Sequence, residues 1–181
     1  MLGWPEMSLT IRPCTPGDAE ALALVGQATF LETYAEVLPA ADILSHCRHQ
    51  HCAELYAQWL ADADYRLWVA CVAETGVAVG YAVLCPPDLP IPTGPSDLEL
   101  KRIYLLARHH GGGVGAGLMT TAIEAAASAG ASRLLLGVYG DNSAAIAFYD
   151  RQGFSKAGVR KFTVGANVYD DLILARSIAA A

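Results

Sequence analysis

Two kinds of hydrophobic pattern divide the chain into helices and strands. Apolar residues recur at helical spacing over residues 19–34, a second helical stretch covers 42–60, and an alanine-rich segment predicts a helix at 114–129. Runs rich in β-branched and aromatic residues at 65–74 and 77–85 predict two strands joined as a hairpin by Thr75-Gly76. The remaining pattern predicts strands at 9–12, 97–106, 133–139, 155–163 and 169–176 and a helix at 143–152.

Turn-forming residues separate these segments. Asp18 suits the start of the first helix, Asp141 or Asn142 the start of the last, and Gly130 and Gly153 the helix ends. The proline-rich segment 86–95 predicts a loop. The resulting order is mixed α/β, with no internal repeat.

Length and charge narrow the classes of protein. The 181 residues suit one domain, which we assign to residues 8–181 after a flexible tail at 1–7. The net charge of −6 argues against nucleic acid as a partner and favours cationic ligands. No signal peptide or membrane-spanning run is evident, so we expect a soluble cytoplasmic protein. An odd, scattered set of cysteines predicts free thiols at Cys14, Cys47, Cys52, Cys71 and Cys85.

The segment HHGGGVGAGLM, which begins at His109, joins a predicted strand directly to a predicted helix. Glycines allow backbone N–H groups to approach a ligand, and the first turn of a helix adds unpaired donors and a positive dipole end. A flexible turn is the alternative, but glycine costs about 1 kcal/mol relative to alanine within a helix, where Gly115 and Gly117 fall. The segment therefore predicts an anion site, most simply for phosphate.

Two familiar phosphate-binding loops fit this segment poorly. A Walker loop needs a lysine and then serine or threonine after its last glycine, whereas Leu118 and Met119 follow Gly117. Gly111, Gly113 and Ala116 satisfy the looser dinucleotide pattern, but no acidic residue ends the following strand to hold a ribose. A nucleoside triphosphatase and a dinucleotide-binding protein are both disfavoured.

Two motifs together resemble the GNAT superfamily of N-acetyltransferases. Residues 110–115 (HGGGVG) fit the family's loop of Gln or Arg, x, x, Gly, x, Gly or Ala, with His110 in the first position. The segment 136–154 (LGVYGDNSAAIAFYDRQGF) resembles the second half of the family's cofactor site. The resemblance covers nearly the whole chain, and residues 99–106 (ELKRIYLL) most resemble the spermidine or polyamine acetyltransferase-like branch.

The resemblance implies a GNAT fold, a central mixed and splayed β-sheet flanked by helices, and acetyl-CoA as acyl donor. The pantetheine arm would pair with free backbone groups at Ile103 and Leu105, with the Ile103 N–H facing the thioester oxygen. For both side chains, ordinary core packing is compatible. The implied cofactor-binding residues are Ile103, Tyr104, Leu105, His110, Gly111, Gly112, Gly113, Val114, Gly115, Ala116, Asn142, Tyr149 and Arg151.

For three of these residues the sequence allows a structural role as well as a role in the site. Tyr149 can protonate the departing thiolate, or serve as an aromatic anchor beside Phe148. Asn142 can cap a helix as well as touch pantetheine. Arg151 can pair with a cofactor phosphate, or can simply be solvated.

Glu99 matches the position where some family members carry a glutamate base. It lies four strand steps from Ile103, about 13 Å at about 3.3 Å per residue, so a bulge or a water relay must shorten the path. Attraction of a cationic amine by Glu99 is the alternative to base catalysis. Phe30 and Tyr34 of the helical insert, together with Glu99, are expected to border the acceptor pocket.

The cluster HCRHQHC at 46–52 contains imidazole and thiol groups, which are zinc ligands. On one helix these side chains would point in different directions, so we expect no metal and an uncoordinated surface or substrate-lid helix.

The sequence therefore predicts direct acetyl transfer from acetyl-CoA to a primary amine of a polyamine, amino acid or similar small molecule. A non-catalytic acyl-CoA-binding module and a protein N-terminal or lysine acetyltransferase are the alternatives. A homodimer is compatible with the sequence.

Overall fold

A computed structural model describes residues 8–178, so the predicted tail at 1–7 lies outside the described residues. One seven-stranded sheet dominates the fold, with strand order β1-β2-β3-β4-β5-β7-β6. Its strands are β1 (Leu9–Pro13), β2 (Arg66–Val72), β3 (Ala78–Cys85), β4 (Asp97–Leu105), β5 (Arg133–Tyr139), β6 (Ser155–Val164) and β7 (Asn167–Ser177). The helices are α1 (Ala19–Tyr34), α2 (Ala40–Gln50), α3 (Ala53–Ala61), α4 (Val114–Ser128) and α5 (Ser143–Arg151).

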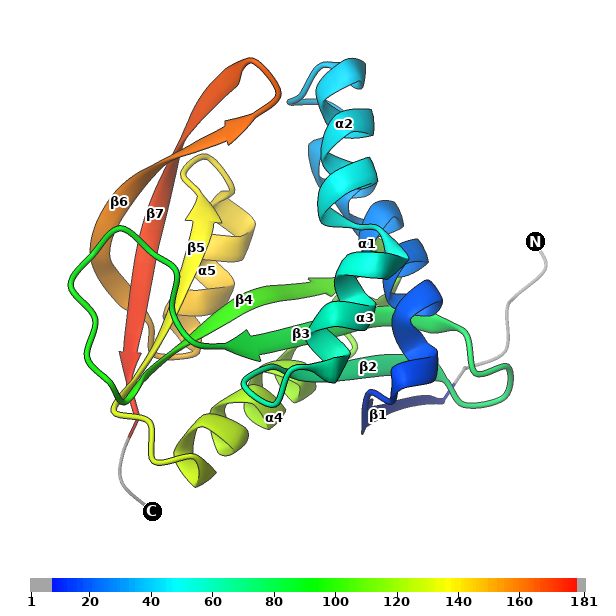
Figure 1. Cartoon of the computed structure of the whole chain (residues 1–181), viewed down its shortest axis with the longest axis horizontal. Coiled ribbons are helices and arrows are strands. Elements are labelled where there is room, and N and C mark those ends of the chain that lie inside the picture. Colours follow the sequence, from blue (N-terminus) through cyan, green and yellow to red (C-terminus); the bar gives the residue numbers. More distant parts are fainter. Residues whose placement is uncertain (1–7, 179–181) are drawn as a thin grey trace.

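The sheet is mixed, and it splays at its centre. All neighbouring strands are antiparallel except β4 and β5, which run parallel. Their pairing covers only Asp97–Glu99 against Arg133–Leu135, after which the two strands diverge (Figure 1). The predicted mixed, splayed sheet in a single domain is confirmed.

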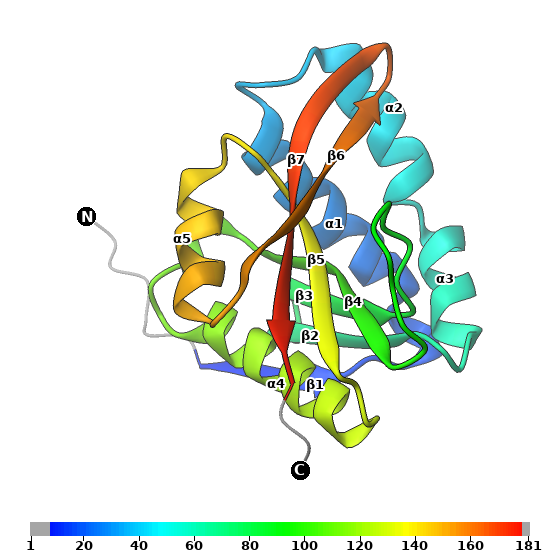
Figure 2. The same cartoon turned by 90° about the vertical axis from the view of Figure 1, so that its left-hand side faces the viewer.

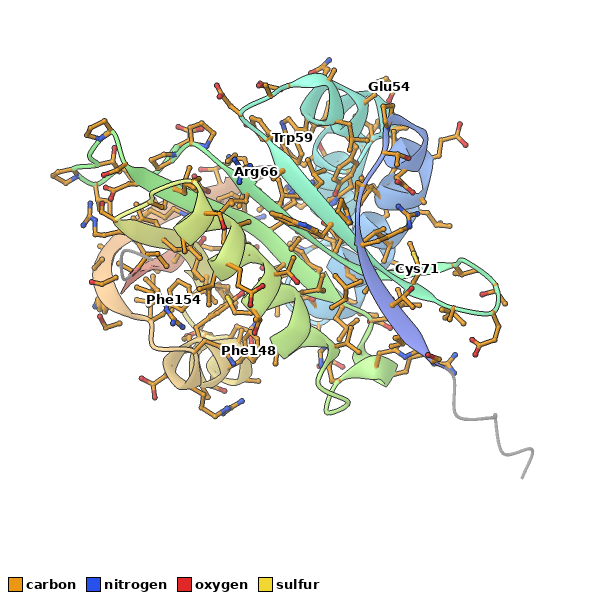
Figure 3. All side chains as sticks on the ribbon, turned by 90° about the horizontal axis from the view of Figure 1, so that it is seen from below. Glu54, Trp59, Arg66, Cys71, Phe148 and Phe154 are labelled. Carbon is orange, nitrogen blue, oxygen red and sulfur yellow. The ribbon has the colours of Figure 1, made fainter. Side chains whose placement is uncertain are left out.

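Helices cover both faces of the sheet. Large apolar side chains of β2 and β3 point alternately to the two faces, which is why β2 is buried along all but its first residue. On one face, α4 packs over the sheet, and Phe148 and Phe154 lie on the same side (Figure 3). On the other face, α1 and α3 bury Leu22, Val25 and Tyr56 against the sheet.

A bulge in β4 sets the direction of its free backbone groups. The register against β3 shifts between Val83 and Leu84, which places an extra residue, Lys101, between Leu100 and Arg102. Beyond the bulge, the Leu106 N–H donates to the Val79 carbonyl at 2.9 Å. Because successive residues of a strand point their backbone groups to alternate sides, those of Ile103 and Leu105 face away from β3, toward the gap.

Two parts of the molecule, which we call its arms, meet beside this gap: the β6–β7 hairpin and the helices α1 and α2. Figure 2 shows β6 and β7 in front of β5, with α5 on one side, α2 and α3 on the other, and α1 behind the hairpin. A small apolar cluster joins the arms, and the Asn167 amide donates to the Asp42 carboxylate of α2 at 2.5 Å. The cluster, which we call the bridging cluster, consists of Phe30, Leu38, Ile43 and Val164, with Tyr34, Cys47, Phe162 and Tyr169 packed against it.

The structure corrects three sequence predictions. The helix predicted at 42–60 is two helices, because the chain leaves helical geometry at His51, whose φ is −131°. Pro13 belongs to β1 and is not part of the turn that follows. Asp18 precedes α1 without capping it, since its carboxylate accepts hydrogen bonds from Arg12 and from the Thr15 N–H at 2.6 Å instead.

Candidate active site

Two cavities open from the gap between β4 and β5. The first, of about 500 Å³, lies against the N-terminal turn of α4 and is called here the glycine-loop cavity. The second, of about 380 Å³, lies against α1 and α2 and is called the insert cavity. Both volumes are typical of small-molecule sites. The cavities share a wall formed by Ile103, Tyr104, Leu105, His110, Asn142, Ala145 and Tyr149.

Glycines shape the first cavity. Gly111 and Gly113 have φ values of +80° and +81°, in the left-handed region that favours glycine. The Gly117 N–H donates to the Gly113 carbonyl at 2.9 Å, which closes the first turn of α4. The N–H groups before Gly117 therefore have no carbonyl one turn back, and a Cβ added at Gly115 would meet nothing within 4 Å. This open, donor-rich cradle fits a pyrophosphate group.

Residues of α5 form the opposite wall. Asn142 caps this helix, because its side-chain oxygen accepts a hydrogen bond from the Ala145 N–H at 3.1 Å. Arg151, at the other end of α5, is exposed and lines the glycine-loop cavity. Gly153, with a φ of +82°, follows the helix end.

Tyr149 lies where the two cavities join. Its ring is 8% exposed and packs edge-on against Phe148 and Phe154, with centroids 5.4 and 6.0 Å away. The Tyr149 hydroxyl makes no hydrogen bond to residues 8–178. Within those residues, every side-chain oxygen or nitrogen that is sealed from solvent has a hydrogen-bond partner, so this unpartnered hydroxyl is not sealed. The hydroxyl therefore opens into cavity space. Burial raises the pKa of the phenol, which keeps it protonated at neutral pH.

Glu99 lines the insert cavity near the bulge. Its side chain is 4% exposed, and its carboxylate accepts a hydrogen bond from the Asp88 N–H at 2.7 Å. The Lys101 ammonium is 3.9 Å away. We expected a bulge or a water relay to shorten the path between Glu99 and Ile103. The structure contains the bulge, at Lys101 between these two residues.

His110 occupies the first position of the loop motif. Its Nε2 lies 2.8 Å from the Leu105 carbonyl oxygen, one of the backbone groups that face the gap. The histidine thus contacts the end of β4 through its side chain. Gly112 and Val114 belong to the loop but do not line either cavity, whereas every other predicted cofactor-binding residue lines the glycine-loop cavity.

The predicted acceptor residues Phe30 and Tyr34 line the insert cavity together with His46, whose ring stacks on Phe30 at 4.2 Å. His51 also lines it and is 1% exposed, so of the two expectations for 46–52 the surface helix is wrong for this residue, which follows the end of α2 at Gln50. The substrate-lid expectation stays a prediction. Burial, with the positive charge of Arg102, lowers the pKa of His46 to about 4 and that of His51 to about 2. Both imidazoles are therefore neutral near pH 7.

Sequence reasoning missed Arg102, which is 9% exposed and lines the insert cavity. It follows the bulge on the same sheet face as Tyr104, because Arg102 and Tyr104 pair with Val83 and Tyr81, two apolar residues of that face. The signal in the sequence was an arginine directly before the apolar run 103–106 of a predicted strand, because a charged residue is rarely buried without a partner.

Residues 8–178 contain no group of three or more histidine, cysteine or acidic side chains placed to bind a metal ion. The described helices also include none long and apolar enough to cross a membrane.

Comparison with known proteins identifies the class. The model of the acetyltransferase (GNAT) family matches residues 30–154. An uncharacterized N-acetyltransferase of Mycobacterium tuberculosis is 33% identical over 89% of this chain and 98% of its own length. The PaiA N-acetyltransferase of Thermoplasma acidophilum, solved with coenzyme A, superposes with a TM-score of 0.77 at 24% identity, covering 94% of this chain and 99% of that one.

A ribosomal-protein-alanine N-acetyltransferase of Brucella melitensis is 27% identical, with a TM-score of 0.69 over 93% of this chain and 99% of its own. The chain belongs to the GNAT acetyltransferase family. It is an acyltransferase that depends on acetyl-CoA, as predicted.

Proposed function

We propose that the protein transfers the acetyl group of acetyl-CoA directly to a primary amine of a small molecule. The observation that carries this proposal is the junction of the two cavities at Ile103 and Tyr149. A donor held in one cavity and an amine held in the other would meet at that wall. No enzyme nucleophile is needed when the two substrates meet directly.

In this proposal the glycine-loop cavity holds the donor. The N–H groups at the start of α4 and the loop of residues 110–116 bind the pyrophosphate, and Arg151 pairs with a phosphate. The Ile103 carbonyl and the Leu105 N–H pair with the pantetheine arm as an added strand, beside Tyr104 and Asn142. His110 orients the end of β4 through the Leu105 carbonyl.

Two side chains of the protein, Glu99 and Tyr149, carry out the proton transfers of the reaction. Glu99 attracts the ammonium form of the acceptor and takes up its first proton through water or directly. The free amine then attacks the thioester carbon, whose oxygen receives a hydrogen bond from the Ile103 N–H. As the N–C bond forms and the C–S bond breaks, Tyr149 protonates the sulfur, and solvent restores the phenol proton while accepting the second amine proton.

The shape of the insert cavity favours a small acceptor over a protein. The bridging cluster and the Asn167–Asp42 hydrogen bond join α1 and α2 to the β6–β7 hairpin beside this cavity. A protein N-terminus or lysine would need an open groove that admits several neighbouring residues. A cavity of about 380 Å³ suits a whole small amine better.

Thiol release with acetyl-CoA tests the proposal across free amino acids, polyamines and peptides that present the same N-terminal residues. Small amines are expected to support turnover, and the peptides are not. Turnover with peptides alone would favour a protein acetyltransferase. Tight CoA binding with no amine-dependent release for any acceptor would favour a non-catalytic acyl-CoA-binding module.

A further inference from the structure

Arg102 is a buried cation without a carboxylate partner in the described chain. Among residues 8–178, the Arg102 guanidinium forms no ion pair, although five other ion pairs are present. Three carboxylates line the same cavity, those of Asp88, Glu99 and Asp171, and none of them forms an ion pair with Arg102. Glu99 contacts Lys101 and the Asp88 N–H, and Asp171 pairs with Arg160 at 2.9 Å. Burying a charge without an opposite charge is costly.

Only one nitrogen of this guanidinium is used by the protein. Nη1 donates to the Tyr56 hydroxyl at 2.7 Å and lies 3.4 Å from His51 Nδ1. Nε and Nη2 make no hydrogen bond to the described residues. Every side-chain nitrogen of those residues that is sealed from solvent has a partner, so Nε and Nη2 are accessible. These donors therefore face the open volume of the insert cavity, which Arg102 lines.

The surroundings hold Arg102 in a fixed orientation. Its guanidinium carbon lies 4.7 Å from the centroid of Trp59 and 5.3 Å from that of Tyr56. The Tyr56 hydroxyl passes the hydrogen bond on to Tyr81 at 3.0 Å. Gly26 of α1 leaves room for this network, because a Cβ there would lie 2.6 Å from the Tyr56 oxygen. A fixed guanidinium with two free donors is suited to bind an oxyanion in bidentate fashion.

We infer that the amine acceptor also carries an oxyanion group, most simply a carboxylate, which binds Arg102 while the amine lies toward Glu99 and Ile103. This inference rests on the proposed transfer to a small amine and selects amino acids over polyamines within it. Glu99 and Arg102 lie on the same face of β4, on either side of the bulge, so this strand presents both an anionic and a cationic group to a zwitterion in the insert cavity. The other two cations of the lining are next to carboxylates, Lys101 beside Glu99 and Arg160 beside Asp171. His46 and His51, which also line the insert cavity, are neutral and add no positive charge beside Arg102.

The decisive experiment compares matched acceptors. The wild-type protein is assayed by thiol release with common amino acids, each beside its amide and beside the amine that lacks the carboxylate, and with spermidine. Rates are expressed per unprotonated amine. An aminophosphonic acid analogue shows whether another oxyanion serves. The amino acid is expected to exceed its matching amine in kcat/KM by about 10- to 100-fold, the effect of a hydrogen bond to a charged group.

Variants assign that preference to Arg102. Arg102→Gln and Arg102→Met are expected to abolish it mainly through KM, while kcat/KM for the matching amine changes only a few-fold. Arg48→Gln removes an exposed arginine from α2 outside the cavity lining and should keep the preference. Calorimetry with N-acetylated amino acids measures the same recognition without turnover, and it decides the question if the Arg102 variants fail to fold.

Equal kcat/KM for amino acid and matching amine in the wild type, or a preference that survives in the Arg102 variants, would overturn the inference. Arg102 would then be a structural cation held by the Tyr56 hydroxyl and by the rings of Tyr56 and Trp59. Failure of the proposed function looks different, since no amine of any kind would then release thiol from acetyl-CoA. In that case, binding of N-acetylated amino acids still tests Arg102 independently.

Discussion

Removal of one oxygen atom at Tyr149 separates catalysis from packing. Tyr149→Phe keeps the ring, which is 8% exposed and contacts Phe148 and Phe154. The hydroxyl has no hydrogen-bond partner within residues 8–178, so its loss leaves no protein group unpaired. We expect the free energy of unfolding to change by less than about 1 kcal/mol, and CoA affinity to change little.

Turnover is expected to respond much more strongly. If the phenol protonates the departing thiolate, its removal should lower kcat by about 10²-fold or more, or roughly 3 kcal/mol at about 1.36 kcal/mol per decade. The assay is thiol release with a rapidly reacting amine, under conditions where chemistry limits the rate. Tyr65→Phe, which removes a phenol hydroxyl outside both cavities, is the matched control. A Tyr149→Phe protein that retains most of the wild-type rate would refute the assignment, and Tyr104→Phe would then test the other tyrosine of the shared wall.

Three further changes test other parts of the account. Gly115→Val should weaken CoA binding in calorimetry by about 10-fold or more. The fold should be preserved, because a Cβ at this position meets no atom within 4 Å. Unchanged affinity would remove the loop from the donor site. Glu99→Gln should reduce turnover most at low pH and recover as free amine becomes abundant, whereas an equal loss at every pH would indicate positioning of the cation instead of proton removal. His51 has a folded pKa of about 2, below its usual value, so the unfolded chain takes up a proton below about pH 6.5 that the folded chain does not. Stability should therefore fall on acidification, by up to about 1.4 kcal/mol per pH unit from this residue. Denaturant titrations at several pH values measure that slope, and a His51→Gln protein with an unchanged slope would rule out this origin.

The sequence was most informative where one residue type has one structural use. Gly111 and Gly113 adopt positive φ at the start of α4, and few other residues would be stable there. Asn142 similarly caps α5 as expected from its position. The strands followed from β-branched and aromatic runs, because burial on both faces of a central sheet requires such residues at nearly every position.

Tertiary contacts decided the features that the sequence did not reveal. The break between α2 and α3 at His51 contains no proline or glycine, and it depends on burying the imidazole against Tyr56 at 3.0 Å. The role of Arg102 depends on the bulge at Lys101 and on aromatic rings contributed by α3, which lies more than 40 residues earlier in the chain. Neither contact leaves a local pattern that spacing or composition could predict.

Direct transfer is the central claim, and the most direct test is to mix the protein with acetyl-CoA in the absence and then in the presence of an amine. We expect no thiol release and an unchanged protein mass without the amine. With it, one CoA thiol should appear for each N-acetylated product, as measured by a thiol reagent and mass spectrometry. A stoichiometric burst of thiol without amine, together with an acetylated protein, would contradict the account, because it would mean that a residue of the chain carries the acetyl group before the acceptor receives it.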